Sequence, residues 1–271
     1  MEKKRFSFSS AYLAVITLIT YLPIAVVVVF SFNDSKLPVA WKGFSLRWYE
    51  ALFRDEALIE ALRNSILLGL VSCLFAAVIG TLGAVGMARV HYKSKGMMEF
   101  LSTIPIMLPE IILGMVFMAF FSLLRLPFGW TTLIIAHTSF CIPYVYLMVK
   151  ARLVGIDRSI EEAARDLGAT PAQAFFDVTL PLILPAVASG CILSFAMSFD
   201  DVVISIFVNG PTLSTLPIKV YTQVRTGVTP EINALCTIIL CAVIAVLLLS
   251  SALRRKDALH DGKKTKGRRL G

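Results

Sequence analysis

The apolar residues of this chain gather into blocks of about twenty, separated by short segments rich in polar and charged residues. An α-helix rises about 1.5 Å per residue, so a block of this length can cross the ~30 Å hydrocarbon core of a bilayer. Six blocks qualify: residues 11–32, 65–88, 101–124, 131–149, 182–208 and 233–253. The pattern predicts an all-α, polytopic membrane protein with six transmembrane helices, and its first block is expected to be a span and not a cleaved signal peptide.

Composition and charge add an orientation to this picture. Hydrophobic residues make up 57% of the chain, and its mean hydropathy is +0.77. All 26 lysines and arginines lie outside the six blocks, and 18 of them fall on the side of the N-terminus. Because cytoplasmic loops carry the excess of basic residues, we expect a cytoplasmic N-terminus at 1–10, a transmembrane domain at 11–253 and a basic cytoplasmic tail at 254–271. The net charge of +8 then reflects topology and contact with membrane lipid, and nucleic-acid binding is not expected.

Several kinds of site are not expected in this sequence. The five cysteines lie inside apolar blocks with no CxxC spacing, which is typical of packing residues and not of a metal site or a disulfide framework. A phosphate-binding GxxxxGK[ST] loop is not found either, since GKKT at 262–265 lacks the upstream glycine and the spacing. The chain is therefore not expected to be an enzyme or to hold a cofactor of its own.

The segment between the fourth and fifth blocks, residues 155–181, predicts a cytoplasmic helix–turn–helix. Ser159 and Glu162 have the spacing of a capping box at the start of a first short helix. Thr170 and Gln173 have the same spacing at the start of a second helix. The second helix is expected to end at Leu180-Pro181, where the fifth span begins.

The same segment resembles the EAA loop of ABC importer permeases, whose pattern is EAA-x3-G-x9-I-x-LP. The matching residues are Glu162, Ala163, Ala164, Gly168, Val178, Leu180 and Pro181, with valine in place of isoleucine. The resemblance implies a type I, MetI-like permease fold and a loop that couples the spans to a separate ATPase, which holds ATP and magnesium. Gly168 is expected to end the first helix with a positive φ. The alternative is that Glu162 only caps a helix and that the two alanines are only good helix formers.

The spans contain acids but no bases. Glu110 lies in the third block and the adjacent Asp200 and Asp201 lie in the fifth. A carboxylate in a bilayer costs roughly 2.5–3.5 kcal/mol, so such residues commonly mark a transport pathway. Ser194 and Ser198 share a helical face with Asp201, and this stripe is expected to face inward. The charges suit a cationic substrate such as a polyamine, whose ammonium groups could also contact aromatic rings; the candidate rings are Trp48, Tyr144 and Tyr146.

Three stretches narrow the resemblance to the C-type permeases of spermidine/putrescine importers: WKGFSLRWYEALFRD, SFDDVVISIFVNGP and TGVTPEINAL. In that family an acidic pair in span five and an aromatic residue of the first outer loop are linked to polyamine uptake. By position these are Asp200, Asp201 and Trp48, with Glu110 in place of an acid of span three. The resemblance implies a heterodimer with a second permease, two copies of an ATPase subunit and an extracytoplasmic polyamine-binding protein, in a bacterial inner membrane.

Other interpretations of these residues remain open. Asp200 and Asp201 could form structural hydrogen bonds to a partner helix, Glu110 could be a structural pair, and Trp48 could be an interfacial anchor. His137, alone in the fourth block, is interpreted as a packed and hydrogen-bonded residue. The cargo could be another organic cation or another small solute. A self-sufficient channel or intramembrane enzyme is disfavoured, because it would leave the EAA loop unexplained and the spans hold no nucleophile–base pair.

Overall fold

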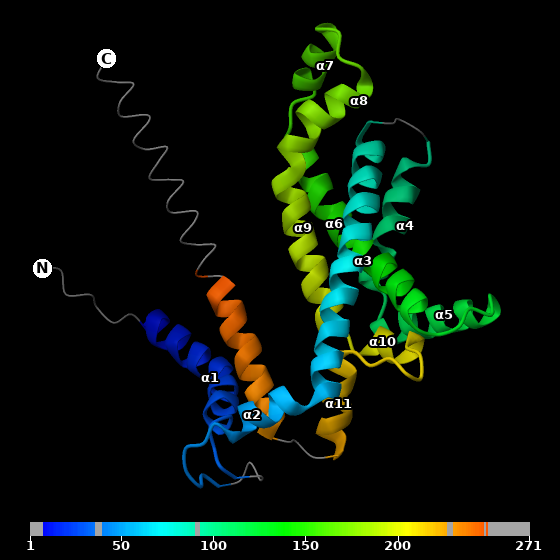
Figure 1. Cartoon of the computed structure of the whole chain (residues 1–271). Helices are drawn as coiled ribbons and strands as arrows, with labels where there is room; N and C mark the ends of the chain where they lie inside the picture. The colour runs from blue at the N-terminus through cyan, green and yellow to red at the C-terminus, as the bar shows by residue number, and fades with distance from the viewer. Residues whose placement is uncertain (1–7, 36–39, 90–92, 227–229, 247, 249–271) are drawn as a thin grey trace, which may run out of the picture. The chain divides into compact units, whose positions relative to one another are not determined.

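The computed structural model describes residues 8–35, 40–89, 93–226, 230–246 and 248 (Figure 1). These residues are almost entirely helical, with one isolated bridge between Asn33 and Phe44. The chain divides into two units. The first unit consists of Met1–Glu56 and Gln223–Gly271, and the second consists of Ala57–Thr222. The helices are α1 Phe8–Phe30, α2 Arg47–Arg54, α3 Glu56–Arg89, α4 Lys95–Met107, α5 Glu110–Leu123, α6 Trp130–Val154, α7 Ser159–Asp166, α8 Pro171–Gln173, the π-helix η1 Ala174–Thr179, α9 Leu180–Asp200, α10 Val203–Val208, α11 Leu216–Thr226 and an unlabelled helix Pro230–Val246.

Each predicted block corresponds to an apolar helix. Within the described part of the chain, four helices are long and apolar enough to cross a membrane by themselves: Ala11–Phe30, α3, α6 and the continuous helix Pro171–Asp200. The third block is a pair of helices, α4 and α5, bent by 106° at their break. The sixth block begins in Pro230–Val246, and its predicted end at 253 lies outside the described residues, as do the basic tail and residues 1–7.

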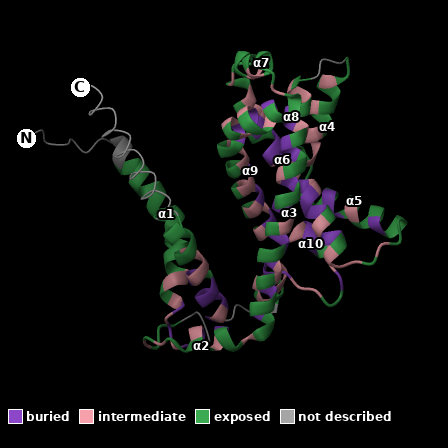
Figure 2. Ribbon diagram, turned by 45° about the horizontal axis from the view of Figure 1, so that its top comes forward, coloured by how far each residue is buried: buried purple, intermediate pink, exposed green. Residues whose placement is uncertain are grey.

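The first unit contains a mostly exposed apolar helix, α1, and the amphipathic helix α2. None of the most apolar window of α1 is buried, as expected for a helix that faces lipid (Figure 2). The short helix α2 ends at Arg54, and the long helix α3 starts at Glu56. Trp48 and Leu52 are the buried residues of α2, whereas Phe53 is exposed.

The second unit is built around α6 and α9, which pack closely along their lengths. Gly190 of α9 allows this approach, because a Cβ added there would lie 2.9 Å from the Cα of Val145 in α6. Gly80 of α3 meets the same part of α6, at the backbone carbonyl of Ile142. Small residues are the usual means by which membrane helices approach one another. Buried positions therefore concentrate on α6 and its neighbours, as the purple segments of Figure 2 show.

Two of the predicted spans are broken, and the two breaks belong to helices that touch. The block 182–208 was predicted as one helix, but α9 ends at Asp200 and α10 starts at Val203. The block 101–124 is interrupted before Glu110, where Pro109 precedes α5. α10 packs on α5, with the ring of Phe207 directly over Gly114. The segment between the fifth and sixth blocks contains a further helix, α11, at Leu216–Thr226.

Candidate functional site

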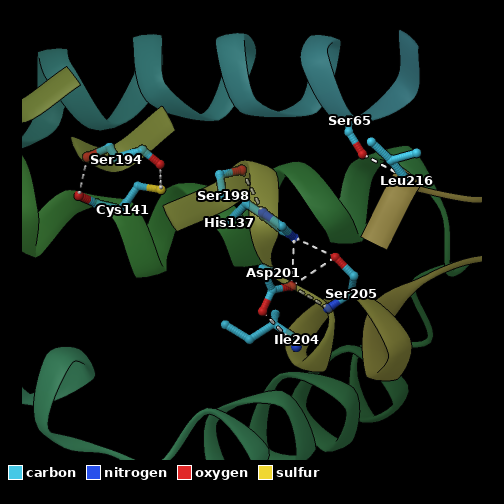
Figure 3. A network of polar contacts seen from close by, with 9 residues as sticks. All are labelled: Ser65, His137, Cys141, Ser194, Ser198, Asp201, Ile204, Ser205 and Leu216. Atoms are coloured by element: carbon cyan, nitrogen blue, oxygen red, sulfur yellow. Dashed lines mark hydrogen bonds and ion pairs between the residues drawn. The ribbon is translucent and has the colours of Figure 1, made fainter. Parts of the chain in front are cut away.

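A buried group of polar side chains joins α6 to the break between α9 and α10 (Figure 3); we call it the break cluster, formed by His137, Ser198, Asp201 and Ser205. The side chains of His137 and Asp201 are only 1% and 2% exposed. Nδ1 of His137 lies 2.8 Å from Oγ of Ser198, and Nε2 lies 3.0 Å from Oγ of Ser205 and 3.5 Å from Oδ2 of Asp201. One histidine of α6 thus contacts the end of α9, the break and the start of α10.

Asp201 caps α10 with both of its carboxylate oxygens. Oδ1 accepts the backbone N–H of Ile204 at 3.1 Å, and Oδ2 accepts the backbone N–H of Ser205 at 2.8 Å and its hydroxyl at 2.9 Å. A carboxylate at this position satisfies N–H groups that have no partner inside the helix. Asp201 itself therefore satisfies two of the N–H groups that the break leaves free, those of Ile204 and Ser205.

The proton positions in the break cluster follow from counting donors. The hydroxyl proton of Ser205 goes to Asp201, so Oγ of Ser205 is an acceptor toward His137. Nε2 of His137 then carries a proton and donates to Ser205. Nδ1 can accept the hydroxyl proton of Ser198, which gives a neutral histidine in which each proton is donated once. The cluster is internally satisfied, as buried polar groups require.

The other two acids of the spans are in a different environment. Asp200 is the last residue of α9 and Glu110 the first of α5, and both are exposed. Glu110 interacts electrostatically with both aspartates, and Tyr144 of α6 interacts with Glu110 and Asp200. We call Glu110 and Asp200, together with the half-buried Tyr144, the exposed acidic group. It offers two carboxylates and one aromatic ring, which is a suitable set for an ammonium ion.

The stripe predicted on one face of α9 does face inward, but it faces packed helix and not an open path. Ser194 donates its hydroxyl to the carbonyl of Cys141 at 3.2 Å, and Ser198 is bound to His137. Ser198 and Asp201 therefore act within the break cluster in this structure. Of the residues named from sequence, Asp200 and Glu110 are the ones left accessible at the breaks.

Trp48 lies in the first unit, in a structural setting. Its Nε1–H donates to the backbone carbonyl of Asn33 at 2.7 Å, and the guanidinium of Arg47 lies 4.2 Å from the centre of its ring. The side chain is buried. Tyr146, the other aromatic candidate beside Tyr144, is also buried, and its hydroxyl lies 3.4 Å from Sδ of Met87.

The segment 155–181 forms the predicted helix–turn–helix, with a different cap on its first helix. Ser159 is not the cap of α7, because Asp157 accepts the backbone N–H of Ser159 at 3.0 Å. This hydrogen bond lowers the pKa of the Asp157 carboxyl below its ordinary value of 3.8. The capping-box prediction for Ser159 and Glu162 was therefore wrong; an aspartate two residues before Ser159 is an equally good local acceptor.

The turn after α7 and the start of the second helix follow the prediction. Gly168 has a φ of +94°, and the next residue, Ala169, donates to the carbonyl of Ala164, which is a Schellman end. Thr170 and Gln173 form the reciprocal capping box. The second helix does not end at Leu180-Pro181 but continues through η1 into α9. A wider π turn before Pro181 accommodates a residue that has no N–H to donate.

The outer surface of α7 carries the residues of the EAA pattern. Glu162, Ala163 and Gly168 are exposed, and the neighbouring Leu167 is 90% exposed. Ala164 is half-buried, and Leu180 and Pro181 lie at the start of α9. An exposed helix that presents small residues and an apolar tip has the form of a docking element.

Comparison with known proteins matches this geometry to a family. Residues 76–261 match the family described as "Binding-protein-dependent transport system inner membrane component". The chain belongs to this family. It is therefore an inner-membrane permease subunit of an ABC importer and is not itself an enzyme, as the sequence predicted.

Its curated relatives include permeases named for polyamines. The putrescine transport system permease protein PotI of Escherichia coli K12 is 44% identical over 230 residues, which are 82% of each chain. The spermidine/putrescine transport system permease protein PotC of Haemophilus influenzae is 38% identical over 253 residues, which cover 93% of this chain and 98% of the relative.

Solved structures confirm the predicted permease fold. A chain of a bacterial ABC importer of alginate superposes with a TM-score of 0.70 at 16% identity, covering 93% of this chain and 99% of the other. A chain of the MetNI methionine ABC transporter gives a TM-score of 0.58 at 20% identity, covering 71% and 92%. At these identities the similarity concerns the fold alone.

Sequence reasoning missed the partners of the named residues. It did not connect His137 or Ser205 with Asp201. It also did not predict a role for Thr179 or an ion pair between Arg89 and Glu161. The spacing of Asp201 and Ser205, one helical turn apart, was the one local signal available. The remaining contacts join different helices and leave no pattern in a single sequence.

Proposed function

We propose that this permease conducts polyamines such as spermidine and putrescine, with Asp200 and Glu110 as the carboxylates that the ammonium groups meet. The observation that carries the proposal is the exposed acidic group at two adjoining helix breaks, in a chain whose predicted spans hold no lysine or arginine. The names of PotI and PotC, to which the chain is 44% and 38% identical, support the same cargo. Helix breaks at membrane depth are typical of transporter binding sites.

The two adjacent aspartates have separate tasks in this proposal. Asp200 is exposed and free to pair with a cation, whereas both oxygens of Asp201 are occupied in the break cluster. Asp201, His137 and Ser198 then hold the break in place, and the break turns Asp200 toward the path. Trp48 anchors the first outer loop through Asn33 and does not contact the polyamine.

Family membership and the charge distribution support the rest of the proposed assembly. The chain pairs with a second permease and with two copies of an ATPase, which dock on α7 through Glu162, Ala163, Ala164 and Gly168 and hold ATP and magnesium. An extracytoplasmic binding protein delivers the polyamine, and alternating access carries it inward. Both termini and α7 face the cytoplasm, which the distribution of lysine and arginine supports.

Uptake of labelled spermidine and putrescine into vesicles that contain the whole transporter tests the proposal. Asp200→Asn and Glu110→Gln each remove one charge that would contact an ammonium group, a contact worth about 1.5–3 kcal/mol, so we expect the half-saturating polyamine concentration to rise about tenfold or more. Glu60→Gln, an exposed acid on α3 away from the breaks, is the matched control and should transport normally.

Two results would contradict the cargo assignment. One is wild-type uptake kinetics in both Asp200→Asn and Glu110→Gln. The other is a wild-type transporter whose ATPase is intact but which takes up no polyamine while it carries an uncharged solute. A wild-type transporter that prefers a different organic cation would keep the acidic group as the site and change only the cargo.

A further inference from the structure

A second polar cluster, at the α7 end of the second unit, ties α7 to α3; we call it the α7 latch, formed by Arg89, Glu161 and Thr179. Nη2 of Arg89 lies 2.7 Å from Oε2 of Glu161 and 3.2 Å from Oγ1 of Thr179. Oγ1 of Thr179 in turn donates to Oε2 of Glu161 at 3.2 Å. The three groups therefore close a triangle in which arginine donates, carboxylate accepts and the hydroxyl does both.

Each member of the latch comes from a different helix. Arg89 is the last residue of α3, Glu161 lies in α7, and Thr179 is the last residue of η1, where it is buried. A second contact runs alongside, since the guanidinium of Arg158 at the start of α7 donates to the backbone carbonyl of Ala88 at 2.5 Å. α7 is thus attached by two arginine contacts to the end of a long apolar span.

A pocket of about 460 Å³ beside the latch leaves α7 without a packed core behind it. Arg89, Glu161, Ile160 and Leu182 are among its lining residues, and across it lie the ends of α4 and α6, joined by an ion pair of 2.9 Å between Glu99 and Lys150. All residues of α7 are exposed or half-buried. α7 is therefore positioned by its packing on η1 and by its polar contacts to α3.

The adjacent glutamates of α7 point in different directions. Glu162, the acid of the EAA pattern, is exposed, whereas Glu161 is half-buried and engaged by Arg89. A partner that binds the Glu162 side and displaces α7 would pull on Arg89 through Glu161. The charge-assisted contact of 2.7 Å holds Glu161 and Arg89 in a defined geometry, so a displacement of Glu161 reaches Arg89 directly.

We propose that the α7 latch transmits the movement of α7 to α3, with Arg89 and Glu161 as positioning residues for transport. The inference rests on the proposed docking of the ATPase on α7 and adds the route by which docking reaches the spans. A partly exposed ion pair contributes only about 0.2–1 kcal/mol to stability. Its loss should therefore leave the fold intact and affect coupling selectively.

The test uses the complete transporter in nanodiscs, with spin labels at Asp166→Cys on α7 and Gly86→Cys on α3, both exposed, in a background without native cysteines. In the parent protein we expect the distance between the labels to stay the same, within about 1 Å, when ATP and vanadate trap the closed ATPase, because α7 and α3 move together. Arg89→Glu and Glu161→Arg should each let the distance change by several ångströms. The exchanged pair, carrying both substitutions, should restore the constant distance.

The neighbouring ion pair supplies the matched control. Glu99→Lys and Lys150→Glu reverse charges of similar exposure between α4 and α6 and do not touch α7, so the label distance should remain constant in both. The milder variants Arg89→Gln and Glu161→Gln repeat the test if charge reversal prevents assembly. In proteoliposomes we expect uptake per ATP hydrolysed to fall at least tenfold in the single latch variants and to recover in the exchanged pair.

The proposal is overturned if the single variants keep a constant label distance, or if the exchanged pair assembles without restoring it. Equal distance changes in the parent and in the variants would also overturn it. The distance measurement needs nucleotide but no cargo, so a failure of the polyamine assignment leaves it interpretable. Failure of the ATPase to bind α7 in the parent protein would instead remove the docking on which the inference rests.

Discussion

The adjacent aspartates at the end of α9 allow one substitution to be compared in two environments. Asp201→Asn replaces one of two acceptor oxygens with an NH₂ group. In one orientation this group faces the backbone N–H of Ser205, which in the wild-type protein donates to Oδ2 of Asp201 at 2.8 Å. In the other orientation it faces the backbone N–H of Ile204. Either way a buried donor is left facing another donor. Asp200→Asn makes the same chemical change on an exposed side chain.

The expected magnitudes differ clearly. An unsatisfied buried N–H costs about 1–3 kcal/mol, and the remaining hydrogen bonds to Asp201 lose the strengthening that a charged acceptor gives, so we expect a total of about 2–4 kcal/mol for Asp201→Asn. An exposed substitution such as Asp200→Asn should change stability by no more than about 0.5 kcal/mol. At about 2–4 °C per kcal/mol, Asp201→Asn should lower the apparent Tm by about 4–16 °C.

The assay is thermal unfolding of the purified transporter in detergent, followed in parallel with polyamine uptake. Asp200→Asn should leave the Tm unchanged and lower the apparent affinity for polyamine. Asp201→Asn should lower the Tm, and its uptake should fall in proportion to the amount of folded protein. Equal Tm values for the two variants would refute the separation of tasks, and so would a larger Tm loss at Asp200.

Four further outcomes can be measured on the same preparation. Trp48→Phe removes the donor to the carbonyl of Asn33 and should lower stability by about 1 kcal/mol while uptake kinetics stay normal, which uptake and Tm together would check. Gly168→Ala places a Cβ at a φ of +94°, costs about 1–2 kcal/mol and should reduce copurification of the ATPase. Gly190→Ala should lower stability by about 1–3 kcal/mol in the same Tm assay, because the added methyl meets the backbone of α6 at 2.9 Å. The pKa of the Asp157 carboxyl is lowered, so the ionised carboxylate stabilises α7 fully at a pH above the ordinary pKa of 3.8. This stabilisation is lost as the pH falls through the lowered pKa. In a series of Tm measurements below about pH 4, Asp157→Asn should not show this loss.

Much of the fold could be predicted from local sequence. The hydrophobic blocks gave all six apolar segments, and Thr170, Gln173 and Gly168 gave the geometry of the turn after α7. These features depend on residues within one or two turns of each other. The prediction failed where two local acceptors competed, as with Asp157 and Ser159, and where a span was broken by its surroundings, as at Asp200.

The sequence by itself determined that the chain enters a membrane, where its helices fall, and which few acids the spans contain, because hydropathy and capping act over short distances along the chain. Only the tertiary structure decided which member of each adjacent acidic pair is engaged and which is free. Neighbouring helical residues point about 100° apart, so the location of a helix break or of a partner such as His137 or Arg89 sets the role of each. Those partners come from other helices, and packing brings them together.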